Sequence, residues 1–220
     1  MDKKIEIYGI RSIIEAIESS KDISRVYLLK SNSHKSSLFR SLVSLLENNN
    51  IKYSFVPKEK FKKFENKNHQ GAVAILSPIK LLSIEELISV TFNKISSKTY
   101  VLLDGITDAR NFGAIIRTAV ASNIDGIIIP QNNSAPVNSD VIKTSSGGVF
   151  KIPIARVNNI KDAILHLDSL EINIISLSEK ANKTIYEYNF KESTAIIMGS
   201  EEKGISKGVL SLSSEILKIP

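Results

Sequence analysis

Apolar positions follow a different pattern in each half of the chain. In residues 8–76, segments with apolar residues at helical spacing alternate with short apolar runs that are typical of strands. The expected helices span residues 10–19 and 37–47, and the expected strands span residues 25–30, 51–56 and 71–77. This alternation predicts a small α/β domain.

From Tyr100 onward, apolar runs are separated by segments of helical periodicity. The runs are VLLD (101–104), GIIIP (126–130), VFKIPIA (149–155), INIISL (172–177), TAIIMG (194–199) and EILKIP (215–220). Strands that are apolar throughout and alternate with helices indicate a parallel sheet covered on both faces. Ligands of such sheets bind beyond the carboxyl ends of the strands. The loops of interest therefore follow Leu103, Pro130, Leu177, Met198 and Ile219.

The two regions are joined by a stretch that reads as a linker. Pro78 ends the first region, and Ser83 with Glu86 has the spacing of a capping box at the start of a short helix. The sequence thus predicts a first domain over residues 1–78, a linker over 79–98 and a second domain over 99–220.

The helix expected before Ser122 contains one interior arginine, Arg117. The apolar stripe of this helix consists of Phe112, Ile115, Ile116, Ala119 and Val120. Arg117 lies just off the stripe, on the flank that it shares with Arg110 and Gly113. A solvated helix face is the simplest interpretation of such a charge. A second cation and a position without a side chain nevertheless leave room for an anionic group.

Composition narrows the classes of function. The 220 residues carry a net charge of +6, with Lys and Arg spread along the whole chain, which favours a polyanionic partner and nucleic acid before membrane. The absence of Cys excludes disulfides, thiolate nucleophiles and cysteine-bound zinc, and the three His residues lack ligand spacing, so no metal site is expected. No apolar run has the length of a signal-peptide core or of a membrane span, so we expect a cytoplasmic protein.

The common phosphate-binding motifs are not supported. No G-x-G-x-x-G sequence follows a strand. The loop GSEEKGIS (199–206) has two glycines at P-loop spacing, but Ile205 stands where the lysine is required and two glutamates stand where phosphate oxygens would lie. Turn formation is the favoured role of Gly199 and Gly204. The acidic loop suits a cationic or zwitterionic ligand, or a cationic side chain.

Other polar residues have two interpretations each. Asn111 is expected to be the N-cap of the Arg117 helix, at the mouth of the site. Asp104 is either a turn residue before Gly105 or a carboxylate of the site. The run KTSSGGVF (143–150) could direct Lys143 to a phosphate, although a helix end is favoured. FKKFENK (61–67) could stack bases, although an amphipathic helix fits it better.

Two long segments together resemble a known family. LDGITDARNFGAIIRTA and IIMGSEEKGIS are similar to the first and second signatures of the SpoU family of RNA ribose 2'-O-methyltransferases, and SSGGVFKIPI matches the span between them. YGIRSIIEAI and HQGAVA resemble the substrate-binding domain of its ribosomal-RNA branch, the RlmB-like guanosine methyltransferases. The resemblance covers nearly the whole chain.

The resemblance implies a knotted parallel-sheet (SPOUT, trefoil knot) methyltransferase domain, preceded by a small α/β RNA-binding domain. It also implies a homodimer and S-adenosylmethionine as the methyl donor. The residues that match the polar active-site positions are Asn111, Arg117 and Glu201. The positions that match or border the methyl-donor pocket are Leu177, Ser178, Met198, Gly199 and Ile219. The candidate RNA contacts are Arg11, Arg110 and Lys143.

The implied activity is 2'-O-methylation of a ribose in structured RNA, most simply a guanosine of large-subunit ribosomal RNA. Transfer RNA as substrate and a non-catalytic ribosome-assembly factor are the alternatives. EILKIP is similar to the opening of a third signature, which in relatives runs on into a helix, whereas this sequence stops at Pro220. We therefore expect the 220-residue chain to be truncated and to bind the methyl donor weakly.

Overall fold

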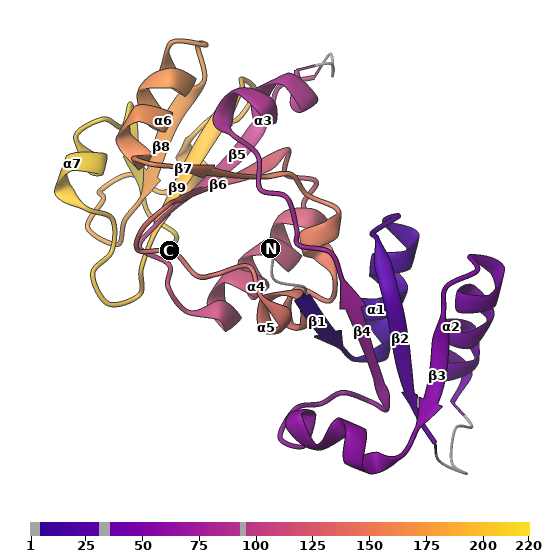
Figure 1. The fold of residues 1–220 in the computed structure, drawn as a ribbon. Helices are drawn as coiled ribbons and strands as arrows, with labels where there is room; N and C mark the ends of the chain where they lie inside the picture. Colours follow the sequence, from indigo (N-terminus) through magenta and orange to yellow (C-terminus); the bar gives the residue numbers. More distant parts are fainter. Residues whose placement is uncertain (1–4, 31–35, 93–95) are drawn as a thin grey trace. The chain divides into compact units, whose positions relative to one another are not determined.

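The computed structural model describes residues 5–30, 36–92 and 96–220, so residues 93–95 of the predicted linker lie outside it. The chain forms two compact units. Unit 1 contains residues 1–80 and 137–151, and unit 2 contains residues 81–136 and 152–220. Both units are α/β structures, each with its own sheet (Figure 1).

Unit 1 is built on a four-stranded mixed sheet in the order β1-β4-β2-β3. Its elements are β1 (Ile5–Tyr8), α1 (Ile10–Glu18), β2 (Ile23–Leu29), α2 (Ser37–Asn48), β3 (Tyr53–Val56), the 3₁₀ helix η1 (Lys58–Phe64) and β4 (Ala72–Leu76). β4 is antiparallel to both β1 and β2, whereas β2 and β3 are parallel. The predicted helices and strands are confirmed, but β1 was not predicted, and residues 58–64 form a 3₁₀ helix where an amphipathic helix was expected at 61–67.

Side chains on the two faces of this sheet have different neighbours. Along β2, Val26 and Leu28 are fully buried, whereas the intervening Tyr27 is only partly buried, as the two-residue period of a strand requires. Helices α1 and α2 pack against each other and cover one face. On the opposite face, Phe61 and Phe64 of η1 pack with Tyr8 and Val73.

Residues 137–151 follow β6 in the sequence but pack within unit 1. They form α5 (Ser139–Thr144) and the 3₁₀ helix η2 (Gly148–Phe150). The Tyr8 hydroxyl donates to Asp140 Oδ1 at 2.5 Å, and the Lys67 ammonium lies 2.7 Å from the same oxygen. Polar contacts of a helix from the second half of the chain thus fasten it to the first half.

Unit 2 contains a six-stranded sheet in the order β10-β8-β9-β5-β6-β7, with every neighbouring pair parallel. Its strands are β5 (Thr99–Asp104), β6 (Gly126–Pro130), β7 (Ile154–Val157), β8 (Asn173–Leu177), β9 (Thr194–Gly199) and β10 (Glu215–Leu217). Its helices are α3 (Ile84–Thr91), α4 (Ala109–Ala121), α6 (Ile160–Asp168), the 3₁₀ helix η3 (Ile185–Glu187) and α7 (Lys207–Leu210). The predicted parallel sheet is confirmed.

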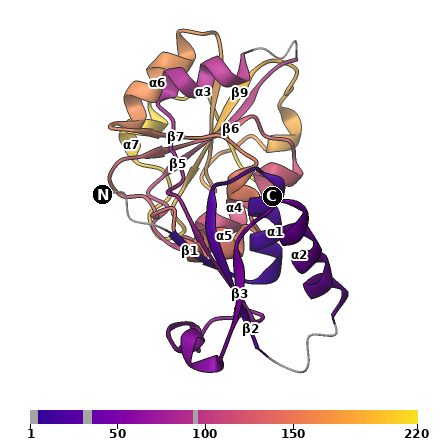
Figure 2. The same ribbon diagram turned by 45° about the vertical axis from the view of Figure 1, so that its right-hand side comes forward.

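Helices cover both faces of the unit 2 sheet. α3 and α6 lie on one face and α4 lies on the other (Figures 1 and 2). The capping box predicted for Ser83 and Glu86 is confirmed at the start of α3. This helix does more than link the domains, because Ile84 and Leu87 belong to the hydrophobic core of unit 2.

The strand predicted at residues 149–155 is corrected by the structure. Residues 148–150 form η2, and the strand itself, β7, begins at Ile154. Gly147, just before η2, has φ +84°, which ends α5 in a turn rather than allowing an extended chain. The expectation that the glycines of KTSSGGVF terminate a helix is confirmed.

Candidate active site

The carboxyl ends of four neighbouring strands of unit 2 form one edge of its sheet. Leu177 at the end of β8 pairs with Leu217 of β10, and Gly199 at the end of β9 pairs with Asp104 of β5. Met198, the residue before Gly199, pairs with Leu103. The fold thereby gathers Leu177, Met198 and Gly199 at the edge where the sequence predicted a site.

The loop 199–206 folds back on the end of β9. The Gly204 N–H donates to the Ser200 carbonyl at 2.8 Å, and Gly204 has φ +65°. A Cβ on Gly199 would lie 2.1 Å from the Gly204 carbonyl carbon, so only glycine fits at position 199. The Asp104 carboxylate accepts from the Ser206 N–H at 2.8 Å, which ties the far end of the loop to β5.

Asn111 and Glu201 lie together in the structure. The Asn111 side-chain amide donates to Glu201 Oε1 at 3.1 Å. The expectation that Asn111 caps α4 is wrong. Asp108 is the N-cap, and its carboxylate accepts from the N–H groups of Arg110 and Asn111. Because Asp108 caps the helix, the Asn111 side chain is free to reach the loop 199–206.

Arg117 lies two turns further along α4 and is exposed. Among the residues that the structure describes, it forms no ion pair with Glu201 or with any other carboxylate. Arg110, in the first turn of the same helix, is exposed as well. α4 therefore presents two guanidinium groups to solvent, and these can bind an anion through several N–H donors each.

Ser178 and Ile219 follow the ends of β8 and β10. The Ser178 N–H donates to the Leu217 carbonyl at 2.8 Å, and its hydroxyl accepts from the Lys180 N–H at 3.3 Å. Ile219 is 64% exposed, so its side chain does not contribute to the core. A hollow next to these ends is lined by Ser178, Lys180, Ala181, Asn182, Lys183, Leu210 and Ile216.

A second hollow adjoins the loop 199–206. It is lined by Asp104, Gly105, Thr107, Asn133, Ser200, Glu202, Lys203, Gly204 and Ser206. The sequence prediction missed Thr107, Asn133 and Lys203 in this group. Thr107 lies inside the LDGITDARN segment and so had a local signal, whereas Asn133 is in a loop after β6 whose path the pattern of apolar residues does not determine.

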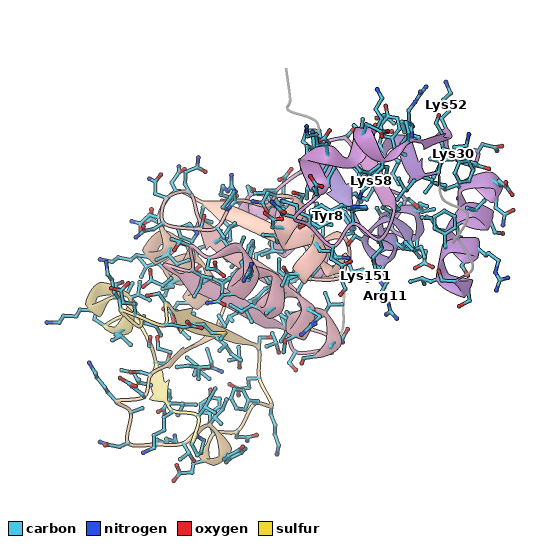
Figure 3. The ribbon with its side chains drawn as sticks, turned by 90° about the horizontal axis from the view of Figure 1, so that it is seen from below. Tyr8, Arg11, Lys30, Lys52, Lys58 and Lys151 are labelled. Atoms are coloured by element: carbon cyan, nitrogen blue, oxygen red, sulfur yellow. The ribbon has the colours of Figure 1, made fainter. Side chains whose placement is uncertain are left out.

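The other two predicted RNA contacts, Arg11 and Lys143, belong to unit 1. Arg11 is exposed on α1, and Figure 3 shows its side chain extending away from the ribbon. Lys143 is half-buried, with its ammonium 3.2 Å from Gln70 Oε1, and burial lowers the pKa of Lys143. Arg11 is therefore open to a partner, while Lys143 is already engaged by Gln70.

The described part of the chain offers neither a metal site nor a membrane-spanning helix. No group of three or more His, Cys, Asp or Glu side chains there could hold a metal ion. None of the helices described combines the length and apolar composition that crossing a bilayer requires.

Comparison with known proteins identifies two family models along the chain. Residues 98–220 match the SpoU rRNA Methylase family, and residues 7–82 match the model described as RNA 2'-O ribose methyltransferase substrate binding. The second model ends at residue 82, close to the end of the first segment of unit 1 at residue 80. Residues 137–151 fall within the first model but pack in unit 1.

Similar proteins agree with these models. An uncharacterized tRNA/rRNA methyltransferase of Mycoplasma pneumoniae is 33% identical over 97% of this chain and 87% of its own length. The 23S rRNA (guanosine-2'-O-)-methyltransferase RlmB of Vibrio vulnificus is 33% identical over 70% of this chain and 62% of its own length. The solved structure of the SpoU methyltransferase AviRb from Streptomyces viridochromogenes, in complex with AdoMet, is similar in fold, with a TM-score of 0.80, 19% identity and coverage of 99% and 81%.

Proposed function

The chain belongs to the SpoU rRNA Methylase family, and on that premise we propose that it transfers a methyl group from S-adenosylmethionine to a ribose 2'-hydroxyl of ribosomal RNA. The observation that carries the proposal is the contact between Asn111 of α4 and Glu201 of the loop 199–206. It joins the two sequence signatures at the carboxyl edge of the parallel sheet, where ligands of such sheets bind.

The ends of β8, β9 and β10 fit the methyl donor. Leu177 and Met198 offer half-buried apolar surface for an adenine ring. The side-chain position of Gly199 is filled by the backbone of Gly204 and Ile205, which holds the loop 199–206 at the end of β9. The acidic loop suits the positive sulfonium and the zwitterionic methionine part of this molecule. When bound, S-adenosylmethionine supplies an electrophilic methyl group.

Arg117 is the residue that we assign to orienting the target ribose, through the RNA phosphate next to it. A hydroxyl is a poor nucleophile until it is oriented and relieved of its proton. A guanidinium holds its own proton firmly and is a poor base. Arg117 is therefore assigned to bind the RNA phosphate next to the target ribose, where it orients the hydroxyl and stabilises developing negative charge, while the phosphate accepts the proton.

The Asn111–Glu201 pair is assigned a positioning role. Its hydrogen bond fixes the loop 199–206 against the first turn of α4, and Arg117 extends from the same helix. Glu201 does not pair with Arg117 in the described structure, so the arginine is not neutralised before RNA binds. Asn111 and Glu201 thus keep the donor loop and the RNA-binding helix in a fixed relation.

Charge distribution supports RNA as the substrate. Residues 1–80 and 137–151, which form unit 1, contain 17 Lys and Arg against 9 Asp and Glu, a net charge of +8. The remaining residues contain 12 against 14, a net charge of −2. A phosphate backbone is therefore attracted to unit 1.

The similarity to RlmB favours a guanosine of large-subunit RNA as the target. Transfer RNA is the second candidate, because the name of the Mycoplasma relative includes both tRNA and rRNA.

We include a homodimer in the proposal because apolar side chains are exposed beside β10. Ile216 is 39% exposed and Ile219 is 64% exposed, and Tyr186 and Phe190 are 82% and 40% exposed. The Ile185 N–H donates to the Lys218 carbonyl, so the segment around η3 adjoins the end of β10. A second copy would cover this apolar surface. Sedimentation at micromolar concentration should show a dimer, and a monomer would contradict this part.

The test of the proposed activity compares three proteins in an assay of methyl transfer from labelled S-adenosylmethionine to ribosomal RNA. Arg117→Ala should lower transfer at least about 100-fold, because loss of one group that stabilises transition-state charge has effects of this size. Its affinity for RNA should fall by about the same factor as that of Arg110→Ala, because each variant loses one phosphate contact. Arg110→Ala, on the same helix, is the control and should weaken RNA binding without a comparable loss of turnover.

The outcomes separate the alternatives. A parent protein that binds ribosomal RNA but neither binds S-adenosylmethionine nor transfers methyl groups would indicate the non-catalytic assembly factor. Equal transfer by parent and Arg117→Ala would show that Arg117 is only a solvated charge. Transfer to transfer RNA alone would contradict the ribosomal substrate and leave the chemistry intact.

A further inference from the structure

A pocket in unit 1 is lined by aromatic and charged side chains and plays no part in the site described above. We call it the η1 pocket. The residues that line it are Leu29, Lys58, Glu59, Phe61, Lys62, Glu65 and His69. All of them come from the end of β2, from η1 and from the turn before β4. The pocket is therefore complete within one unit.

Two rings form the apolar part of the η1 pocket. Phe61 is 3% exposed and is held in the cluster of Tyr8, Phe64 and Val73, so its position is fixed by packing. The His69 ring lies against it, with ring centroids 4.8 Å apart and planes inclined by 41°. His69 itself is only partly buried. The accessible ring is therefore that of His69, which the buried Phe61 ring supports from behind, and a base can stack on it from solvent.

Hydrogen bonding of His69 determines which edge of its ring is available. The Gly71 N–H donates to His69 Nδ1 at 2.9 Å. In the neutral ring the proton must then reside on Nε2, which leaves an N–H donor for a ligand. Burial lowers the pKa of His69, which keeps the ring neutral at pH 7. The ring therefore offers a stacking surface and one directed donor rather than a positive charge.

Charged groups around the rings match the remaining chemistry of a nucleotide. Lys58 and Lys62 are exposed cations suited to phosphate, and Lys30, after β2, lies near the same strand ends because its N–H donates to the Val56 carbonyl. Figure 3 shows the side chains of Lys30 and Lys58. Glu59 and Glu65 are carboxylates that can accept N–H groups from a base edge.

We propose that the η1 pocket binds one unpaired nucleobase of the substrate RNA, stacked on the His69 ring that Phe61 supports, with Lys58 and Lys62 on its phosphates. The base must be unpaired because a base inside an A-form helix is stacked between its neighbours and offers no free face to a side-chain ring. The inference rests on the proposed function only in taking RNA as the substrate. It adds a recognition element distant in sequence from the methyl-transfer residues.

The test measures affinity for two RNA probes of equal length and charge, a hairpin with a five-nucleotide loop and a fully paired duplex. The parent should bind the hairpin about 10-fold or more tightly than the duplex, since stacking of one base contributes an effect of this size. His69→Asn retains an acceptor for the Gly71 N–H but lacks the ring. It should bind both probes equally, at the affinity of the parent for the duplex.

Matched variants exclude simpler causes. His69→Gln keeps a donor near the position of Nε2 without an aromatic face, so it should also lose the preference for the hairpin if stacking is the source. Lys62→Ala should weaken the hairpin more than the duplex, because Lys62 is assigned to the phosphates of the unpaired nucleotide, and it should lower the hairpin's slope of log affinity against log salt concentration by about 0.7. Thermal unfolding of each variant checks that unit 1 is intact.

Nuclear magnetic resonance of the His69 ring protons gives an independent readout. Titration with the single-stranded loop sequence alone should shift these signals in the parent. Equal affinity of the parent for hairpin and duplex, or an unchanged preference in His69→Asn, would overturn the inference. These measurements need no methyl donor, so a protein that prefers the hairpin but transfers no methyl group would contradict the proposed function and leave the η1 pocket assignment standing.

Discussion

Asp108 and Asn111 have different roles at the start of α4: Asp108 caps the helix, and Asn111 binds Glu201. The Asp108 carboxylate accepts from two backbone N–H groups that the helix leaves without partners. Asn111, in the third position of the helix, uses its amide for Glu201. Both residue types are good caps, and the apolar stripe begins at Phe112, so the sequence alone favoured the wrong one. The pairing with Glu201, 90 residues away, has no local signal.

Exchanging donor and acceptor tests the Asn111–Glu201 pair. Asn111→Asp faces the Glu201 carboxylate with a second carboxylate, and the repulsion should displace the loop and lower methyl transfer about 10-fold or more. The double variant Asn111→Asp with Glu201→Gln restores a hydrogen bond with its polarity reversed and should recover most of the lost activity. The measurement is initial rate at saturating RNA.

The stability of these variants should change little, because Glu201 is exposed and Asn111 only half-buried. Asp108→Asn is the matched control, since Asn caps a helix about as well as Asp, and it should remain active. Full activity of Asn111→Asp would contradict the positioning role. Activity lost in both the single and the double variant would assign the charge of Glu201 a direct part in the reaction.

At the scale of elements, the loop 199–206 depends on close backbone contact rather than on side chains. Gly199 packs on the backbone of Gly204 and Ile205, and Asp104 binds the far end of the loop. An apolar strand followed by Gly predicted a turn at this place. The pattern of residue types did not indicate that the backbone of Gly204 and Ile205 packs back on Gly199, the first residue of the loop.

Gly199→Ala should lower the free energy of unfolding by about 1–3 kcal/mol, because the added methyl group collides with backbone that cannot rotate away. Gly204→Asn is the matched control, since nothing lies within 4 Å of a Cβ at that position and Asn tolerates the left-handed conformation. Its cost should stay below about 1 kcal/mol. Urea unfolding measures both, and equal costs would contradict the collision.

Long apolar runs predicted their elements well, and short or mixed segments did not. β5, β6, β8 and β9 are buried on both faces and read as continuous apolar runs. β1 has four residues, one of which is Glu6, so periodicity could not distinguish it from a polar terminus. Val149, Phe150 and Ile152 are apolar because they are buried in and just after η2, not because they belong to an extended strand.

At the scale of the whole molecule, the charge is divided unevenly. Unit 1 carries a net charge of +8 and unit 2 a net charge of −2, although the lysines are spread along the sequence. The total charge predicted a polyanionic partner, and RNA, the substrate class of the family, is a polyanion. Residues 1–80 alone contain 15 Lys and Arg against 8 Asp and Glu, a net charge of +7, so most of this division can be counted from the sequence, and the fold adds a net +1 from residues 137–151.

The division of charge predicts a difference between two triple variants. Replacing Arg11, Arg25 and Lys52 of unit 1 by Gln should lower the slope of log RNA affinity against log salt concentration by up to about 2.7. Replacing Lys161, Lys191 and Lys207 of unit 2 by Gln changes the net charge equally and should leave the slope nearly unchanged. Equal effects of the two variants would mean that RNA is held by total charge alone.

The interleaving of the two units constrains how this protein could exchange parts with its relatives during evolution. A recombination point near residue 80 would transfer β1–β4 with α1 and α2 but leave α5 behind. The incoming domain would then need its own equivalents of Tyr8 and Lys67 to receive Asp140. Unit 1 of this chain can therefore be grafted intact onto another methyltransferase only with two inserts, residues 1–80 and residues 137–151.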